Sequence, residues 1–315
     1  MIIIKDLTKT YKRRISRKEG KFRTINAINK INLTIKDGEI LGLIGPNGAG
    51  KTTTLKILSN LILPDSGTVT LDGHNIIKKP NLIKKPDFIK NKIGLLSGEF
   101  TRSLYWRLTG LQNMIFFAKL RGMWKPQERI QELIQMFKLE AYIDEFVMKY
   151  STGMKHKLAL AIALLNDPQV LFLDEPLTGI DPFTNFELKK IIKNEFKEKT
   201  IIWASHNLYE IEEMCDRIAL INNGKIVLQG EPEVLKKNYW DHTKILITTD
   251  KSQEFVSFDN VDIRGNFVEI KTNNVTRTVL EIIDLIKDKG IEITDIKTLK
   301  PSLEEIFLEG VKNAR

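Results

Sequence analysis

The architecture of this chain follows from the segment Gly45-Pro46-Asn47-Gly48-Ala49-Gly50-Lys51-Thr52-Thr53. Two glycines five residues apart, followed by Lys and Thr, form the pattern of a phosphate-binding P-loop. The apolar run before it, residues 39–44, predicts a buried strand, and residues 53–58 after it have helical spacing. Such a strand–loop–helix points backbone N–H groups and the positive end of the helix dipole at one place. The segment therefore predicts a binding site for a nucleoside triphosphate.

Charged and hydroxyl side chains around this segment predict how the phosphates are held. Lys51 would reach the outer phosphates as a point charge, and the Thr52 hydroxyl would hold Mg²⁺. Further along, the apolar run over residues 170–173 predicts a buried strand that ends in Asp174 and Glu175. Acids at that end of a buried strand are costly unless they face a site. In a P-loop protein, the first of them is the partner of Mg²⁺.

Length and composition limit what else the chain can be. Its 315 residues allow one large domain and a small one. The single cysteine, Cys215, excludes an internal disulfide and a thiolate zinc site, and favours a reducing compartment. We expect no signal peptide. The most apolar helical run, residues 158–165, is far shorter than the ~20 residues of a membrane span, so any membrane role requires a partner.

The formal net charge of +9 leaves three kinds of partner open. Much of the positive charge lies in residues 9–23 and 78–92. Such segments suit nucleic acid, an anionic membrane surface or a solvated face. The basic residues are not interleaved with aromatic residues that stack on bases, which weakens the nucleic-acid interpretation. We favour the solvated face.

Taken in order, these motifs resemble those of the ATP-binding subunit of an ABC transporter over about the first 235 residues. The ending PSLEEIF, residues 301–307, resembles that of ABC-2-type exporters, including drug and sodium extrusion ATPases. The resemblance implies an α/β P-loop NTPase cassette in residues 1–238. It would have a central, mostly parallel sheet, an antiparallel β lobe and a helical subdomain at about residues 97–165. A small accessory α+β domain would occupy residues 239–315.

By this resemblance, individual residues acquire roles in ATP binding and hydrolysis. The segment quoted above is the P-loop. Tyr11 takes the place of the aromatic residue that stacks on adenine, although it also suits a half-exposed sheet edge. Thr52 and Asp174 hold Mg²⁺. Glu175 is the catalytic glutamate that polarises the attacking water, and His206 is the switch histidine that hydrogen-bonds the γ-phosphate.

A second group of residues would act on the nucleotide of another copy. Residues 150–154, YSTGM, lie where the family's signature motif, usually Leu-Ser-Gly-Gly-Gln, is found. There Ser151, which is also placed to cap a helix, and the Gly153 N–H close over the ATP of the other subunit. Asp181 lies in the loop at the dimer contact. Because these groups act on the nucleotide of the other subunit, the resemblance implies a homodimer or heterodimer with two shared sites. One preorganised hydrogen-bond donor of this kind raises a reaction rate roughly 10²–10³-fold.

Two positions depart from the family pattern. The family has a Gln after the strand predicted over residues 93–96, and here either Gly98 or Glu99 occupies its place. Gln gives Mg²⁺ a neutral oxygen and senses the membrane partner, whereas Gly98 offers no side chain and Glu99 adds a negative charge. In the signature, Thr152 and Met154 replace Gly and Gln. Met154 cannot make polar contacts to a ribose.

The region after residue 239 predicts a small α+β lobe. Strands are predicted over residues 244–249, 267–271 and 291–299, with a helix over 275–289 that ends at Gly290. The apolar face of that helix is predicted to comprise Val279, Ile282, Ile283 and Ile286. Ser302 and Glu305 predict a capping box for a last helix. The lobe serves either dimerisation or regulation, or plain structural packing.

The sequence thus favours a cytoplasmic ATPase subunit, peripheral on the inner face of the cell membrane, that powers an ABC-type exporter. The helical insertion, residues 97–149, would dock on a separate transmembrane permease, and nucleic acid is not an expected partner. One alternative is a soluble ABC ATPase acting on ribosomes or nucleic acid, but no second P-loop or sustained heptads are present. A regulator without turnover is another alternative, which Glu175 argues against.

Overall fold

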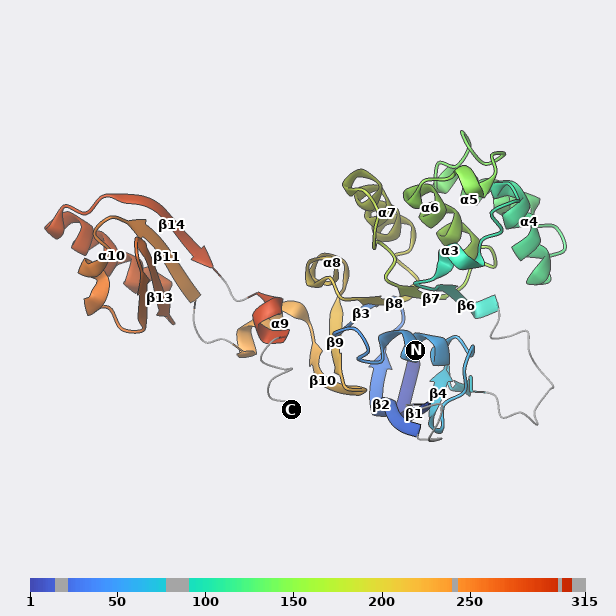
Figure 1. The fold of residues 1–315 in the computed structure, drawn as a ribbon, viewed down its shortest axis with the longest axis horizontal. Helices are drawn as coiled ribbons and strands as arrows, with labels where there is room; N and C mark the ends of the chain where they lie inside the picture. Colours follow the sequence, from blue (N-terminus) through green and yellow to red (C-terminus); the bar gives the residue numbers. More distant parts are fainter. Residues whose placement is uncertain (15–21, 78–90, 240–242, 300–301, 308–315) are drawn as a thin grey trace. The chain divides into compact units, whose positions relative to one another are not determined.

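The computed structural model describes residues 1–14, 22–77, 91–239, 243–299 and 302–307. Two compact units are present, Met1–Gln229 and Gly230–Arg315, shown in Figure 1. Residues 15–21 of the first basic segment and residues 78–90 of the second lie outside the described residues. The predicted domain division at residue 238 remains a prediction.

The central sheet of the first unit has six strands in the order β10-β9-β3-β8-β7-β6. They are β3 (Ile40–Ile44), β6 (Ile93–Leu96), β7 (Val170–Asp174), β8 (Thr200–Ser205), β9 (Arg217–Asn222) and β10 (Lys225–Gly230). β3 pairs in parallel with β8 and β9, and β7 pairs in parallel with β8 and β6. Because these strands run the same way, their carboxyl ends meet at one edge, where open α/β sheets bind ligands. The predicted mostly parallel sheet is confirmed.

A four-stranded sheet, β2-β1-β4-β5, forms the predicted antiparallel β lobe. Its strands are β1 (Ile2–Arg14), β2 (Phe22–Ile35), β4 (Ser66–Leu71) and β5 (His74–Asn75). Helix α1 (Lys51–Leu58) contributes Leu55, Ile57 and Leu58 to one apolar core shared with residues of both sheets. Burying these side chains fixes α1 against the end of β3.

Helices gather on one side of the sheet, near β8, β7 and β6, as Figure 1 shows in green and olive. They are α3 (Phe100–Ser103), α4 (Gly110–Leu120), α5 (Gln127–Met136), η1 (Val147–Lys149), α6 (Thr152–Ala163) and α7 (Pro182–Glu195). Buried α6 contacts α3, α4, α7 and β6. Helix α8 (Leu208–Met214) packs on β3 and β8. Among the described residues, no helix is long and apolar enough to cross a bilayer.

The second unit is an α+β lobe with the sheet order β12-β13-β11-β14. Its elements are α9 (Pro232–Tyr239), β11 (Thr243–Thr249), η2 (Ser252–Ser257), β12 (Val261–Arg264), β13 (Phe267–Thr272), α10 (Val275–Lys289) and β14 (Ile293–Leu299). The predicted helix over residues 275–289 is confirmed, and Gly290 ends it with φ +58°. The predicted capping box is also present, because Glu305 N–H donates to Ser302 Oγ at 3.3 Å.

One prediction for α10 is wrong. Ile283 is exposed, whereas Val279, Ile282 and Ile286 pack into the core of the lobe. Successive helical residues are rotated by about 100°, so Ile283 turns away from the face that Ile282 occupies. Leu285 takes its place in the core.

An ion pair joins the first residues of the central sheet to the antiparallel lobe. Arg217 Nη1 donates to both carboxylate oxygens of Glu39, at 2.9 and 3.1 Å, and to the Thr34 carbonyl at 3.3 Å. The Glu39 side chain is only 8% exposed. Arg217 is thus the cation that pairs with this nearly buried carboxylate.

We expect Arg217→Ala to lower the free energy of unfolding by about 3 kcal/mol, because it leaves a buried carboxylate without a partner. Urea unfolding followed by circular dichroism measures the change. The double variant Glu39→Gln/Arg217→Met is the control and should recover much of the loss, since no unpaired charge remains. A loss below about 1 kcal/mol for Arg217→Ala would be typical of an exposed pair and would contradict this role.

Candidate nucleotide-binding and catalytic site

The P-loop connects β3 to α1 through glycines in left-handed conformations. Gly48 has φ +81° and Gly50, at the N-cap of α1, has φ +116°. A Cβ on Gly50 would lie 2.4 Å from the Ala27 carbonyl oxygen, so only glycine is accommodated there. Gly50 gives α1 no side-chain cap. The first N–H groups of the helix therefore remain available to an anion.

Lys51 is buried beside this loop, with 6% of its surface exposed. Its Nζ donates to the Gly45 carbonyl at 2.7 Å and, at 3.4 Å, to that of Pro46. Burial lowers the pKa of Lys51, and the charges of Glu175 and Asp174 oppose that shift. An ammonium group held by neutral carbonyls can exchange them for the more strongly binding oxygens of a phosphate.

Thr52 and Asp174 bring two oxygen donors together at the end of β7. Thr52 Oγ1 donates to Asp174 Oδ1 at 3.2 Å. Asp174 is 4% exposed, and burial raises its pKa, while hydrogen bonds from Thr52 and the Gly98 N–H lower it. These are donors that Mg²⁺ prefers. No group of three or more His, Cys, Asp or Glu suited to a metal occurs among the described residues.

Glu175 follows Asp174 and lies against His206. His206 Nδ1 is 2.9 Å from each carboxylate oxygen of Glu175, and Thr178 Oγ1 donates to Oε2 at 3.0 Å. The backbone of Glu175 is left-handed, with φ +52°, and its N–H donates to the Ala204 carbonyl at 2.8 Å. Such a conformation costs of order 1–3 kcal/mol and is concentrated at functional sites. The carboxylate is thus fixed where it can accept a proton or orient a water.

A cavity of about 390 Å³ unites these groups. Asn47, Thr52, Asp174, Glu175 and His206 line it, although they come from three separate parts of the sequence. Sequence reasoning missed Phe100, His156 and Thr178, which also line it. Thr178 lies three residues after Glu175, in a turn where its N–H donates to the Glu175 carbonyl at 3.3 Å. No local signal indicated the other two.

Of the two candidates for the family's Gln, Gly98 lies beside Asp174. A Cβ built on Gly98 lies 3.4 Å from Asp174 Oδ2, whereas Glu99 is exposed and pairs with Arg102 at 3.1 Å. The backbone of Gly98 hydrogen-bonds the Asp174 carboxylate. Gly98 therefore offers no side-chain oxygen to a metal held by Asp174.

Four predicted residues outside the P-loop do not line this cavity, and of the P-loop residues only Asn47 and Thr52 line it. Tyr11 lies on β1, 41% exposed, with Lys9 Nζ 5.7 Å from its ring centroid. Ser151 caps α6 by accepting from Met154 N–H at 3.2 Å. Asp181 caps α7, and its carboxylate accepts from Thr184 N–H at 2.9 Å, which lowers its pKa. Gly153 packs against the Thr184 side chain. The roles of these four remain predictions.

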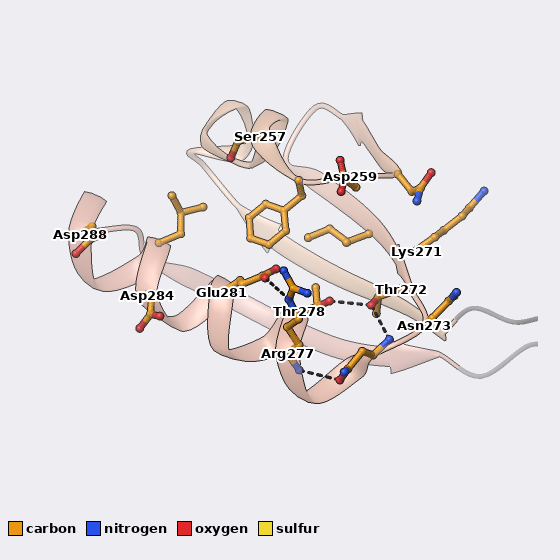
Figure 2. Close-up of a pocket in the computed structure, with 15 residues that line it drawn as sticks. Ser257, Asp259, Lys271, Thr272, Asn273, Arg277, Thr278, Glu281, Asp284 and Asp288 are labelled. Carbon is orange, nitrogen blue, oxygen red and sulfur yellow. Dashed lines mark hydrogen bonds and ion pairs between the residues drawn. The ribbon is translucent and has the colours of Figure 1, made fainter.

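A larger cavity, of about 760 Å³, lies in the second unit against α10 (Figure 2). Its rim carries the acidic side chains of Asp259, Asp284 and Asp288, and Arg277 is engaged with Glu281 at 2.9 Å. Acidic groups repel a polyphosphate. This cavity is therefore not the nucleotide site, despite its size.

The comparisons with known proteins agree with this geometry. The family model "ABC transporter" matches residues 28–178, and "ATP-binding protein DrrA1-3-like, C-terminal domain" matches residues 230–311. The chain is 35% identical over 220 residues to the ABC transporter ATP-binding protein NatA of Bacillus subtilis, covering 69% of this chain and 87% of that one. It is 28% identical over 300 residues to the daunorubicin resistance ATP-binding protein DrrA3 of Streptomyces coeruleorubidus, covering 92% of each.

Among solved structures, the chain resembles a dimeric, post-hydrolysis state of the ATP-binding cassette MJ0796 bound to ADP and phosphate. The TM-score is 0.61 at 28% identity, over 73% of this chain and 98% of that one. Strand, P-loop, helix and strand-end acids define a P-loop nucleoside triphosphatase. The helical subdomain, the antiparallel lobe and the similar proteins reported above narrow that class to one family. The chain belongs to the ATP-binding proteins of ABC transporters, with a DrrA-like C-terminal domain, and is an ATPase of that family.

We expect Lys51→Ala to weaken binding of ATP about 10- to 100-fold, since it removes a charged hydrogen bond to phosphate. Isothermal titration calorimetry measures the affinity. Lys56→Ala is the matched control, because Lys56 lies five residues after Lys51 on the same helix, at the rim of the cavity, and its loss changes the net charge equally. Undiminished binding by Lys51→Ala would show that the loop does not hold the phosphates.

Proposed function

We propose that this chain is the ATP-hydrolysing subunit of an ABC-2-type exporter and works as a dimer of cassettes. The observation that carries the proposal is the convergence of Lys51, Thr52, Asp174, Glu175 and His206 on one edge of the sheet. These side chains supply the cation, the oxygen donors, the base and the hydrogen-bond donor that γ-phosphate hydrolysis needs. The names of NatA and DrrA3 support transport as the process that this hydrolysis powers.

Each side chain has one task in hydrolysis. Lys51 and the first N–H groups of α1 bind the phosphate oxygens, and Mg²⁺, held through Thr52 and Asp174, would neutralise further charge. Glu175 accepts a hydrogen bond from the attacking water and orients it in line with the γ-phosphate. His206, now hydrogen-bonded to Glu175 at 2.9 Å, turns its imidazole to the γ-phosphate oxygens as the charge on them develops.

Closure of the site in trans is supported by residues outside the cavity. Ser151 and Asp181 are exposed, and each already caps a helix, α6 or α7. Exposed caps on long helices offer N–H groups and hydroxyls to a second molecule. The relative MJ0796 was captured as a dimer with ADP and phosphate. Tyr11 would stack on the adenine of its own chain.

Docking on a permease at the cytoplasmic face is supported by the helical region. Large apolar side chains are exposed there at Tyr105, Trp106, Phe116, Leu120 and Trp124, the last 90% exposed. The Tyr105 and Phe116 rings pack edge to face with centroids 4.7 Å apart. Grouped exposed aromatics mark protein interaction sites. The relatives reported above, named for transport and drug resistance, give no support to action on ribosomes or nucleic acid.

We expect Glu175→Gln to bind ATP with parental affinity but to lose at least about 10²-fold in hydrolysis, because the amide cannot act as the base. With magnesium and ATP, the variant should elute as a dimer in size-exclusion chromatography with light scattering. The parent should return to monomer as ATP is consumed. Hydrolysis by the variant at the parental rate would remove Glu175 from its proposed role.

Mixing two inactive variants tests whether the sites are shared. Lys51→Ala and Ser151→Arg should each be inactive alone, because each damages both sites of a symmetric dimer. An equal mixture should recover about a quarter of the parental rate, since half of the dimers are mixed and each keeps one intact site. Activity no higher than the sum of the separate variants would place Ser151 outside the site.

A further inference from the structure

His156 is a buried histidine that has no role in the ATPase mechanism described above. It lies in α6, five residues after Ser151, and only 2% of its surface is exposed. Its Nδ1 is 3.0 Å from the Thr152 carbonyl oxygen. A carbonyl oxygen only accepts, so Nδ1 carries the proton and donates. Burial lowers the pKa of His156, which keeps the ring neutral and leaves Nε2 with a free lone pair.

That lone pair has no partner within the part of the chain that the structure describes. His156 Nε2 is fully buried and forms no hydrogen bond. A buried polar atom left unpaired costs about 1–3 kcal/mol, and the large majority of buried side-chain polar atoms have a hydrogen-bond partner. The same ring lines the nucleotide cavity together with Thr52, Asp174 and Glu175. Because Nδ1 is bonded to its own helix, Nε2 is the ring nitrogen that is left to accept a hydrogen bond.

The ring is held in this position by the segment that follows β6. Phe100 packs on the His156 imidazole with ring centroids 4.2 Å apart. Two residues before Phe100, Gly98 lies against Asp174 and contributes no side-chain oxygen. The cavity therefore lacks a polar side chain at Gly98 and has an unused acceptor at His156.

We propose that His156 is a further residue of the nucleotide site, whose Nε2 accepts a hydrogen bond from a water molecule of the hydrated magnesium–ATP complex. A water bound to a cation is a strong donor, and a neutral imidazole is a suitable acceptor. His156 thereby supplies the polar group that Gly98 does not. This role rests on the nucleotide site proposed above.

The position of His156 also connects the nucleotide site of its own chain with Ser151, the residue proposed to act on the nucleotide of the partner. The helix that carries His156 into its own cavity begins with Ser151, which caps it and is proposed to close over the nucleotide of the partner. The two residues are separated by about 7.5 Å along the helix axis. A hydrogen bond at Nε2 would therefore hold α6 in one position when its own cavity is filled.

The first test is binding of the non-hydrolysable analogue AMP-PNP, with magnesium and with EDTA, by titration calorimetry. His156→Phe keeps an aromatic ring on Phe100 but removes the acceptor. We expect it to lower the affinity about five- to tenfold with magnesium, the scale of one net hydrogen bond, and less than twofold with EDTA. His156→Gln, which retains a neutral acceptor, should recover the magnesium-dependent part.

A second variant separates the lost acceptor from disturbed packing. Gly98 has an ordinary φ, and a Cβ there meets nothing closer than 3.4 Å, so the backbone at this position accepts a side chain. Gly98→Gln in the His156→Phe background should restore magnesium-dependent affinity, because it places a neutral oxygen beside Asp174. Non-additive effects of the two changes would show that they act on one function.

Nitrogen NMR of ¹⁵N-histidine-labelled protein reports the contact directly. The Nε2 resonance, assigned by its loss in His156→Phe, should shift when AMP-PNP and magnesium are added, and not with AMP-PNP in EDTA. An unshifted resonance, or equal loss of affinity in His156→Phe and His156→Gln, would overturn the proposal. Lys51→Ala is measured in parallel. If the parent binds AMP-PNP and Lys51→Ala does not, a negative result at His156 leaves the nucleotide site itself intact.

Discussion

Parallel pairing of β3 with β8, and of β8 with β7, is the constraint on which the rest of the first unit depends. In register, Ile44 lies beside Ser205, and Asp174 lies beside Ala204. The three strands therefore deliver the P-loop, the acidic pair and His206 to one edge, although more than a hundred residues separate the P-loop from the other two. A change in register would turn alternate side chains to the opposite face. The site would then lose its acids while keeping its P-loop.

Burial places charges in this site that solvent no longer stabilises. Burial lowers the pKa of Lys51, and the charges of Glu175 and Asp174 oppose that shift. It raises the pKa of Asp174, and hydrogen bonds from Thr52 and Gly98 offset part of that shift. The site therefore has two acids, Asp174 and Glu175, beside the ammonium of Lys51, with little water. A ligand that carries both phosphate and a cation would stabilise these charges. The left-handed backbone of Glu175 indicates that the fold accepts a local cost to aim this carboxylate.

Local patterns predicted much of this, because they depend on neighbouring residues only. The P-loop, the acids after β7 and the full extent of α10 could be identified from spacing. The wrong placement of Ile283 shows the limit, since a run of apolar residues does not say which of two adjacent ones faces the core. Phe100 and His156 lie far apart in sequence and meet only through packing of α3 on α6. No one-dimensional pattern contains that contact. The choice between Gly98 and Glu99 needed the position of Asp174.

The packing around helix α6 means that the helix moves as a rigid unit. Its residues from Leu158 to Ala163 are all buried, so it moves only together with the elements packed around it. Close-packed interiors transmit displacement and do not absorb it. One turn carries Ser151 at a surface, and the next carries His156 at a cavity. A ligand that fixes the position of His156 therefore also restricts the position of Ser151. The helix itself need not change shape, because a rigid element moves as a whole.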